Sequence, residues 1–299
     1  MDILTIRGLT KHFGDKEVLR GLELTVPEHS VFGFIGKNGA GKTTAMKAVL
    51  GFLKVDGGEI TVCGERVVYG QTPTNRHIGY LPDVPEFYSF MTAREYLRLC
   101  GESLQIEGRE IEKRSEELLL LVGLAEETHR IKGYSRGMKQ RLGIAQALLS
   151  RPRLLICDEP TSALDPIGRR EILDILSSVR HQTTVLFSTH ILSDVERICT
   201  DVAFLHDGKI AVQGAASVIK DARGGEQFGV EMMDGDGKRR LLEAFPDAKQ
   251  TDGETLLLSG GEERMQAVLA FLSAHRLPVR KIERHEPSLE DLFLEVVGK

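Results

Sequence analysis

The sequence has no long apolar run, and the longest one, near Leu118 to Val122, is far too short to cross a bilayer. Its first residues lack the basic and apolar stretches of a signal peptide, so we expect the chain to remain where it is made. The four cysteines lack Cys-x-x-Cys spacing, which argues against a zinc site and favours reduced thiols. A net charge of −5 gives no general attraction to nucleic acid or anionic lipid. These absences favour a cytosolic protein with no nucleic acid partner.

A contiguous stretch, Gly36 to Thr43, has the spacing G-x-x-x-x-G-K-[ST] of a phosphate-binding loop. An apolar run at 31–35 predicts a buried strand before it, and 44–50 reads as a helix after it. In such a loop the lysine, here Lys42, reaches the phosphates, while the hydroxyl of Thr43 ligates Mg²⁺. A Gly-rich turn without a ligand is the alternative, and the flanking strand and helix weaken it. The residues expected around the phosphates are Gly36, Lys37, Asn38, Gly39, Ala40, Gly41, Lys42, Thr43 and Thr44.

Two segments before the loop, 4–9 and 22–26, alternate apolar and polar residues, which predicts half-buried antiparallel strands. The stretch 11–19 between them is expected to be a turn that carries one aromatic residue, Phe13. Phe13 either belongs to the core or stacks on a nucleotide base.

After a strand at 78–83 the pattern becomes helical. Thr92 to Glu95 fit a capping box, and 111–122 predict a second helix with Gly123 as its C-cap. Residues of about 84–150 therefore look like a helical insertion within one nucleotide-binding unit.

Two further apolar strands end in residues that are candidates for metal binding or catalysis. Leu154 to Glu159 end in adjacent carboxylates, and 184–190 end in His190. Ligands of open α/β sheets bind outside the carboxyl ends of the strands. Asp158 is thus a candidate Mg²⁺ ligand and Glu159 a candidate base for an attacking water, with a solvated acidic turn as the alternative. His190 either contacts a terminal phosphate or is an ordinary surface residue.

Five motifs occur in a fixed order: the phosphate loop, YSRGMKQR at 134–141, the Asp158-Glu159 strand, SALD at 162–165 and His190. In this order they resemble the ATP-binding subunit of an ABC transporter, over residues 1 to about 215. The resemblance implies an α/β P-loop NTPase with an antiparallel β subdomain and a helical insertion. It also implies the cofactors ATP and Mg²⁺ and the activity of an ATP hydrolase.

The resemblance assigns roles to the catalytic residues. Asp158 matches the Walker B aspartate, which holds Mg²⁺ together with Thr43. Glu159 matches the catalytic glutamate beside it. His190 matches the switch histidine, which with Lys42 stabilises the γ-phosphate.

Other matches concern the base and the subunit interface. Phe13 matches the aromatic residue that stacks on adenine, and Asp165 belongs to the loop that crosses the dimer interface. Ser135 and Gly137 match the family signature at the start of a helix, although Gly137 also suits plain helix capping. In the family this signature receives the phosphate of ATP held by the opposite subunit, so a second ATP-binding subunit, in a homodimer, is expected.

The sequence departs from the family pattern at three positions. Arg136 stands where the signature usually has Gly, and Met138 where it usually has Gln. Asp83 stands where the family has the Q-loop glutamine. A carboxylate there either binds Mg²⁺, directly or through water, or caps the next turn.

The tail from about residue 220 alternates short strands and two helices with turns, which include DGDG at 234–237. We therefore expect domains at 1–218 and 219–299, the second a small α+β accessory domain. Helical patterns occur at 241–245 and 265–275, and strand patterns at 255–258 and 279–282. The ending at 286–294, with Ser288 as a candidate N-cap after Pro287, resembles drug-export and bacitracin-resistance-type subunits.

That resemblance implies a separate ABC-2-like membrane permease as partner and a place on the inner face of the cell membrane. Export of a drug, peptide antibiotic or lipid-like substrate is the expected function. The alternative is a soluble ABC-type ATPase that acts on ribosomes or nucleic acid. Such proteins usually carry two cassettes or a long coiled-coil insertion, which this sequence lacks.

Overall fold

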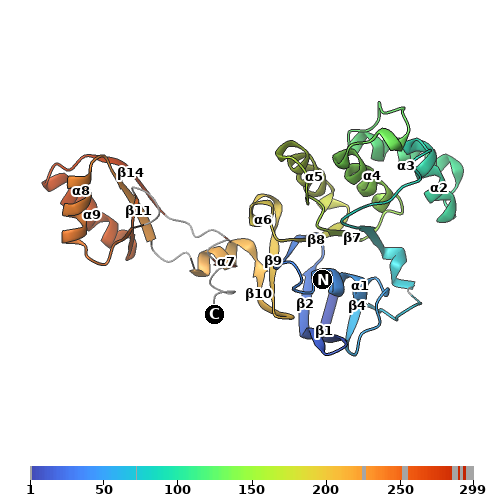
Figure 1. Cartoon of the computed structure of the whole chain (residues 1–299), viewed down its shortest axis with the longest axis horizontal. Coiled ribbons are helices and arrows are strands. Elements are labelled where there is room, and N and C mark those ends of the chain that lie inside the picture. The colour runs from blue at the N-terminus through green and yellow to red at the C-terminus, as the bar shows by residue number, and fades with distance from the viewer. Residues whose placement is uncertain are drawn as a thin grey trace. The chain divides into compact units, whose positions relative to one another are not determined.

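The structure is a computed structural model that describes residues 2–71, 73–223, 227–250, 255–284, 289 and 292–293. The chain forms two compact units, Met1–Ala216 and Ser217–Lys299 (Figure 1). A helix, α7 (Ala216–Arg223), begins at the last residue of the first unit. Among the described residues, no helix combines the length and apolar character needed to cross a membrane.

The first unit opens with an antiparallel sheet in the order β2-β1-β4-β5. Its strands are β1 (Asp2–Phe13), β2 (Lys16–Pro27), β4 (Gly57–Val62) and β5 (Glu65–Arg66). The two predicted antiparallel strands are confirmed, but the predicted turn at 11–19 is wrong. Strand β1 continues to Phe13 and β2 begins at Lys16, so only Gly14 and Asp15 lie between them. Register shifts interrupt the pairing of β1 and β2, and such bulges hide a strand from a test of strict alternation.

The second sheet has six strands in the order β10-β9-β3-β8-β7-β6. All adjacent pairs are parallel except β10 with β9. The central strands are buried throughout, as parallel strands covered on both faces must be. The strands are β3 (Val31–Ile35), β6 (Ile78–Leu81), β7 (Leu154–Asp158), β8 (Thr184–Thr189), β9 (Asp201–His206) and β10 (Lys209–Ala215).

One helix, α1 (Lys42–Val49), connects the two sheets through a shared core. Met46 and Val49 of this helix, Leu22 of β2 and Phe34 of β3 belong to one buried cluster. The helix begins two residues earlier than the sequence pattern suggested, directly after Gly41. Its first residue is therefore Lys42, the lysine of the phosphate loop.

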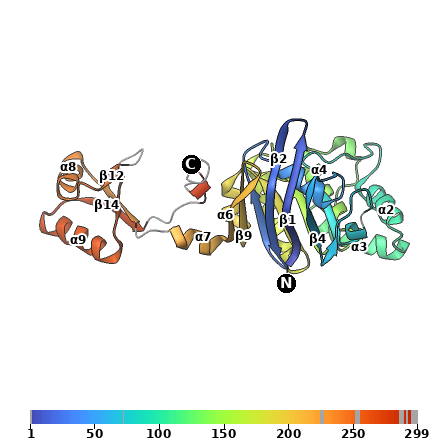
Figure 2. The same ribbon diagram turned by 90° about the horizontal axis from the view of Figure 1, so that it is seen from below.

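The stretch between β6 and β7 contains α2 (Ala93–Ser103), α3 (Gly108–Leu121), a 3₁₀ turn η2 (Ile131–Gly133) and α4 (Arg136–Leu148). The predicted capping box is present at α2: Thr92 accepts from the Glu95 backbone N–H, and the Glu95 carboxylate accepts from the Thr92 backbone N–H. After α3, Gly123 has the left-handed φ of 64° that favours glycine beyond a helix end. Figures 1 and 2 show α2, α3 and α4 side by side at one end of the first unit.

Four further elements complete the first unit. Another 3₁₀ turn, η1 (Pro73–His77), precedes β6, and α5 (Pro166–Ser178) with η3 (Val179–His181) connects β7 to β8. The helix α6 (Leu192–Ile198) follows β8 and contacts α5.

The second unit has the order β11-α8-β12-β13-α9-β14, and its antiparallel sheet runs β12-β13-β11-β14. This is the split βαβ arrangement of ferredoxin-like folds. Phe228, Val230, Leu256 and Val268 lie in its separate core. The elements are β11 (Gln227–Met232), α8 (Gly235–Ala244), β12 (Lys249–Gln250), β13 (Thr255–Ser259), α9 (Gly261–Ala274) and β14 (Val279–Arg284).

The α/β fold with an antiparallel subdomain and an α+β second unit is thus confirmed, with one local correction. The sequence DGDG at 234–237 was interpreted as a turn but forms the first turn of α8. Asp234 caps this helix by accepting from the Gly237 backbone N–H at 2.7 Å, which offsets the low helix propensity of glycine. The predicted cap at Ser288 lies outside the described residues.

Candidate functional site

Four adjacent strands bring the predicted site residues to one edge of the six-stranded sheet. Across β3, β8, β7 and β6, the residues that follow each carboxyl end are the phosphate loop, His190, Glu159 and Asp83. Because these strands are parallel, their carboxyl ends meet at the same edge. Segments distant in sequence therefore share one site.

The phosphate loop folds around the side chain of Lys42. Its Nζ donates to the Gly36 carbonyl at 2.7 Å and lies 3.4 Å from the carbonyl of Lys37. A Cβ at Gly36 would lie 2.9 Å from the Leu205 carbonyl, and Gly41 has φ 111°, so both positions require glycine. Lys37, Asn38 and Gly39 are exposed, whereas Ala40 and Thr44 are half-buried.

Asp158, at the end of β7, is buried and fully hydrogen-bonded. Its Oδ2 accepts from the Thr43 hydroxyl at 2.8 Å, and its Oδ1 accepts from the Ser188 hydroxyl at 2.7 Å. Ser188 in turn accepts from the backbone N–H of Glu159 at 3.0 Å. Two of the three residues predicted as metal ligands, Thr43 and Asp158, are thus held together at the start of α1.

Glu159 bridges the side chains of Lys42 and His190. One carboxylate oxygen forms an ion pair with Lys42 Nζ at 3.0 Å, and the other lies 2.9 Å from His190 Nδ1. The side chain of Glu159 is mostly buried, whereas that of His190 is 43% exposed. Glu159 itself has a left-handed φ of 47°, a costly conformation for a residue with a side chain. Strand β7 therefore ends at Asp158 and turns the next carboxylate toward Lys42.

The residues at this edge fit Mg²⁺ as a partner of a bound phosphate. Among the described residues, no group of three or more His, Cys, Asp or Glu side chains forms a metal site. Mg²⁺ commonly uses one or two protein oxygens and completes its shell with phosphate oxygens and water. The hydroxyl of Thr43 and the carboxylate of Asp158 supply such oxygens side by side.

Phe13 is half-exposed at the end of β1, which excludes the core interpretation. The ammonium of Lys11 lies 5.3 Å from the centre of its ring, within cation–π range. Lys11 is itself paired with Asp56 at 3.2 Å. An aromatic ring at the surface, held from one side, has the form of a stacking platform.

Ser135 and Asp165 both cap helices. Ser135 accepts from the Met138 backbone N–H at the start of α4, and Asp165 accepts from the Gly168 backbone N–H at the start of α5. A Cβ at Gly137 would meet nothing closer than 4.0 Å. Packing within the described part of the chain thus gives no reason for a glycine at position 137.

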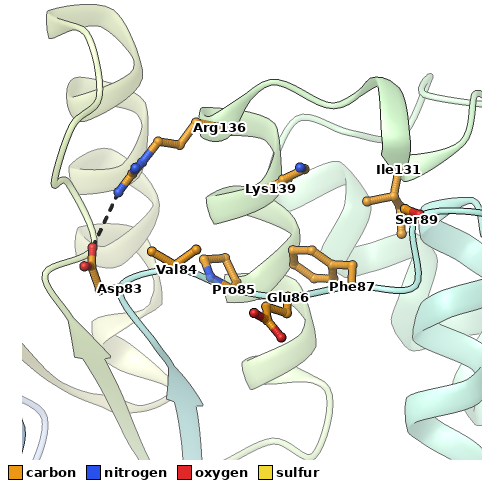
Figure 3. A pocket seen from close by; sticks show the side chains of 9 residues that line it. All are labelled: Asp83, Val84, Pro85, Glu86, Phe87, Ser89, Ile131, Arg136 and Lys139. Atoms are coloured by element: carbon orange, nitrogen blue, oxygen red, sulfur yellow. Dashed lines mark ion pairs between the residues drawn. The ribbon is translucent and has the colours of Figure 1, made fainter.

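Asp83 does not hydrogen-bond to Thr43 or Asp158 in the structure. Its Oδ1 lies 3.5 Å from Nη2 of Arg136, the first residue of α4 (Figure 3). Burial raises the pKa of the Asp83 carboxyl, Arg136 lowers it, and the charges of Asp158 and Glu159 raise it further. The predicted turn cap is absent, and the Asp83 carboxylate faces Arg136 instead.

The Asp83–Arg136 pair closes one end of a cavity of about 470 Å³ between the segment 83–89 and α4. Figure 3 shows Val84, Pro85 and Phe87 along one side and Lys139 on the other. Val84, Tyr88 and Phe90 are strongly exposed for apolar side chains. This part of the first unit therefore offers an apolar surface with charges of both signs.

Sequence reasoning missed two buried polar groups that support the site. Gln140 of α4 is fully buried and donates to the carbonyls of Asp83 and Pro160, at 3.0 and 3.2 Å. Asp194 of α6 is buried and bonded to Thr161 and Arg169. The only available signal was the presence of polar residues in otherwise apolar helical positions, which does not identify their partners.

Comparison with known proteins identifies the family. The ABC transporter family model matches residues 19–162, and the model of the ATP-binding protein DrrA1-3-like C-terminal domain matches 214–297. An uncharacterized ABC transporter ATP-binding protein of Bacillus subtilis, YxlF, is 36% identical, and the alignment covers 99% of each chain. The chain belongs to the ABC transporter ATP-binding subunits. It resembles the bacitracin transport ATP-binding protein BcrA of Bacillus licheniformis, with 35% identity over 99% of this chain and 97% of that protein.

Solved structures agree with this family. An ATP-binding subunit of an ABC transporter has 31% identity and a TM-score of 0.66, covering 74% of this chain and 93% of that one. The fold is shared with cbiO1 of Clostridium perfringens, at 24% identity and a TM-score of 0.68, covering 82% and 96%. As a member of the family, this subunit binds and hydrolyses ATP, dimerises with a second ATP-binding subunit and works with a membrane permease.

Proposed function

We propose that this subunit forms a homodimer around Mg-ATP and drives a separate ABC-2-like permease that exports a drug, peptide antibiotic or lipid-like substrate. The dimer would lie on the inner face of the cell membrane through that permease. In this proposal the ATPase domain comprises residues 1–218, and 219–299 form an accessory domain. No contact to nucleic acid is needed.

The start of α4 is the observation on which the dimer rests. The phosphate loop leads into α1, which contacts β2, β4 and β7, whereas α4 contacts α2, α3, α5 and β6. The backbone N–H groups of Arg136 and Gly137 begin a helix of 13 residues, and Gly137 has no side chain that could cover them. A phosphate bound there would come from a second subunit, as in the family.

Within each site, the side chains would have different roles in ATP hydrolysis. Lys42 and His190 would donate to the γ-phosphate and stabilise the charge that develops there. Glu159 would accept the proton of the attacking water or orient it. Bound Mg²⁺, held by Thr43 and Asp158, would neutralise phosphate charge. Ser188 fixes Asp158 from the side opposite Thr43.

Two comparisons support the proposed role in export. The C-terminal family model is that of DrrA1-3-like ATP-binding proteins, and BcrA is named for bacitracin transport. The apolar surface around Val84 and Phe87 would suit a contact with the permease. Substrate choice would then reside in the permease.

The dimer is tested by light scattering after gel filtration of the full chain in a Glu159→Gln background. We expect a monomer with ADP and a dimer with Mg-ATP. The matched control is Ser135→Arg in the same background, which blocks the start of α4 and should remain monomeric with Mg-ATP. A Glu159→Gln protein that stays monomeric at saturating Mg-ATP would refute the homodimer.

The membrane partner is tested separately. Co-purification from detergent-solubilised membranes should recover a permease, whereas recovery with ribosomes would favour the soluble alternative.

A further inference from the structure

A buried carboxylate, Asp194, lies behind the site and is engaged at both oxygens. Its side chain is 3% exposed. Oδ2 accepts from the Thr161 hydroxyl at 2.6 Å, and Oδ1 accepts from Nη2 of Arg169 at 2.6 Å. A buried charge is tolerated only when it is paired and hydrogen-bonded in this way.

The three bonded residues belong to the segments that carry the chemistry. Thr161 lies two residues after Glu159, in the loop that leads to Asp165. Asp194 lies four residues after His190, in the first turn of α6. Arg169 belongs to α5, which Asp165 caps. One carboxylate thus ties together the loop of the base, the segment of the histidine and the helix at the expected dimer interface.

The loop from Glu159 to Asp165 needs such support. Two of its residues, Glu159 and Ala163, have left-handed φ angles of 47° and 52°. Backbone in this region persists only when the surrounding structure holds it. Thr161, which is 1% exposed, lies between them and makes the bond to Asp194.

We propose that Asp194 is a positioning residue for ATP hydrolysis, which holds Glu159 and His190 in register through Thr161 and Arg169. It contacts neither side chain and acts through the two segments. This inference rests on the proposed roles of Glu159 and His190. Loss of Asp194 should therefore slow the hydrolytic step and leave ATP binding by the phosphate loop unchanged.

The experiment measures kcat, KM and equilibrium ATP affinity of the full-length Asp194→Asn and Thr161→Val variants. Both substitutions keep the size of the side chain. We expect kcat to fall by about 100-fold for Asp194→Asn, as small misplacements of reacting groups can cause, with ATP affinity within about twofold of wild type. The matched control is Asp174→Asn. Asp174 of α5 pairs with Arg197 of α6 at 3.1 Å and links the same two helices at the surface, so its loss should leave kcat within about twofold.

A purely structural role would give a different pattern. In a His190→Gln background, with rates followed in single turnovers, Asp194→Asn should slow hydrolysis by less than about twofold because the pair it positions is already broken. Full additivity in that background, or a parallel loss of ATP affinity, would overturn the proposal. If Asp194→Asn fails to fold, Thr161→Val decides by the same criteria. Undiminished turnover of Glu159→Gln would instead refute the proposed chemistry, so the two failures are distinguishable.

Discussion

Asp83 and Arg136 are ion-paired, with 3.5 Å between Oδ1 and Nη2, and both are positions at which this sequence departs from the usual ABC pattern (Figure 3). In the structure the two departures contact each other, so they form a single feature. A carboxylate in the Q-loop position faces the negative charges of Asp158 and Glu159. The guanidinium of Arg136 offsets that repulsion.

We expect the two substitutions to depend on each other. Arg136→Gly, which restores the usual signature residue, leaves the Asp83 carboxylate without its counter-charge and should reduce the ATPase rate. The double variant Asp83→Gln/Arg136→Gly should recover most of the rate. Since both side chains are nearly half exposed, a double-mutant cycle on unfolding should give a coupling of about 0.2–1 kcal/mol. Strict additivity in both measurements would show that the pair is incidental.

Glu159→Gln should abolish steady ATP hydrolysis and preserve ATP binding. The amide keeps the shape of the side chain but cannot accept a proton from water. Phosphate release at saturating Mg-ATP measures the first effect, and calorimetry measures the second. Glu171→Gln, on the exposed surface of α5, is a suitable control and should hydrolyse ATP normally.

Phe13→Ala should weaken ATP binding if the exposed ring stacks on adenine. A stacking contact of about 1 kcal/mol corresponds to about a fivefold higher Kd. Phe52→Ala removes another ring that is 62% exposed and serves as the control, with no expected change. Equal affinities of Phe13→Ala and wild type in calorimetry would remove Phe13 from the site.

Gly137→Ala should stabilise the monomer and impair the dimer. A Cβ fits here without a contact under 4.0 Å, and alanine is favoured over glycine within a helix by about 1 kcal/mol. The same methyl group would cover the N–H groups offered to a partner's phosphate. Thermal unfolding should thus show a higher Tm, while ATP-dependent dimerisation in the Glu159→Gln background weakens. Gly143→Ala is the opposite case, since its Cβ would lie 2.5 Å from Leu81, and it should lower Tm.

The capping box of α2 should make stability depend on pH. The backbone N–H and hydroxyl of Thr92 lower the pKa of the Glu95 carboxyl below its ordinary value of 4.5. A carboxyl with a lowered pKa in the folded state stabilises the fold above its unfolded pKa, and this contribution is lost as pH falls through the folded pKa. Wild type should therefore have a higher Tm than Glu95→Gln at pH 7. The difference should shrink below the ordinary pKa, and a constant difference down to low pH would contradict the assignment.

The sequence predicted the elements whose signals are local. The phosphate loop, the buried strands β3, β7 and β8 and the Thr92 capping box depend on residues within a few positions of one another. The pairing of β1 with β2 past Lys11 was missed because bulges break the alternation. The predicted turn at DGDG was wrong because the hydrogen bond that caps the helix at Asp234 offsets the low helix propensity of the two glycines.

The same contrast between local and long-range signals applies to the site residues. Motif spacing placed Thr43, Asp158, Glu159 and His190 at one sheet edge, where the structure also has them. It did not reveal that Asp83 meets Arg136, because that contact joins two half-exposed side chains far apart in sequence. Nor did it reveal the bonds of Asp194, since burial of a single aspartate is set by the packing of α5 against α6.

The left-handed backbone at Glu159 and Ala163 has a consequence for anyone who evolves this protein in the laboratory. Glycine adopts that conformation more readily than any other residue, so Glu159→Gly and Ala163→Gly would relieve local strain. A library sorted only for heat resistance would favour such changes, and the first of them removes the carboxylate proposed to act on water. Selection for robustness alone would thus drive the subunit toward a form that holds ATP without turning it over.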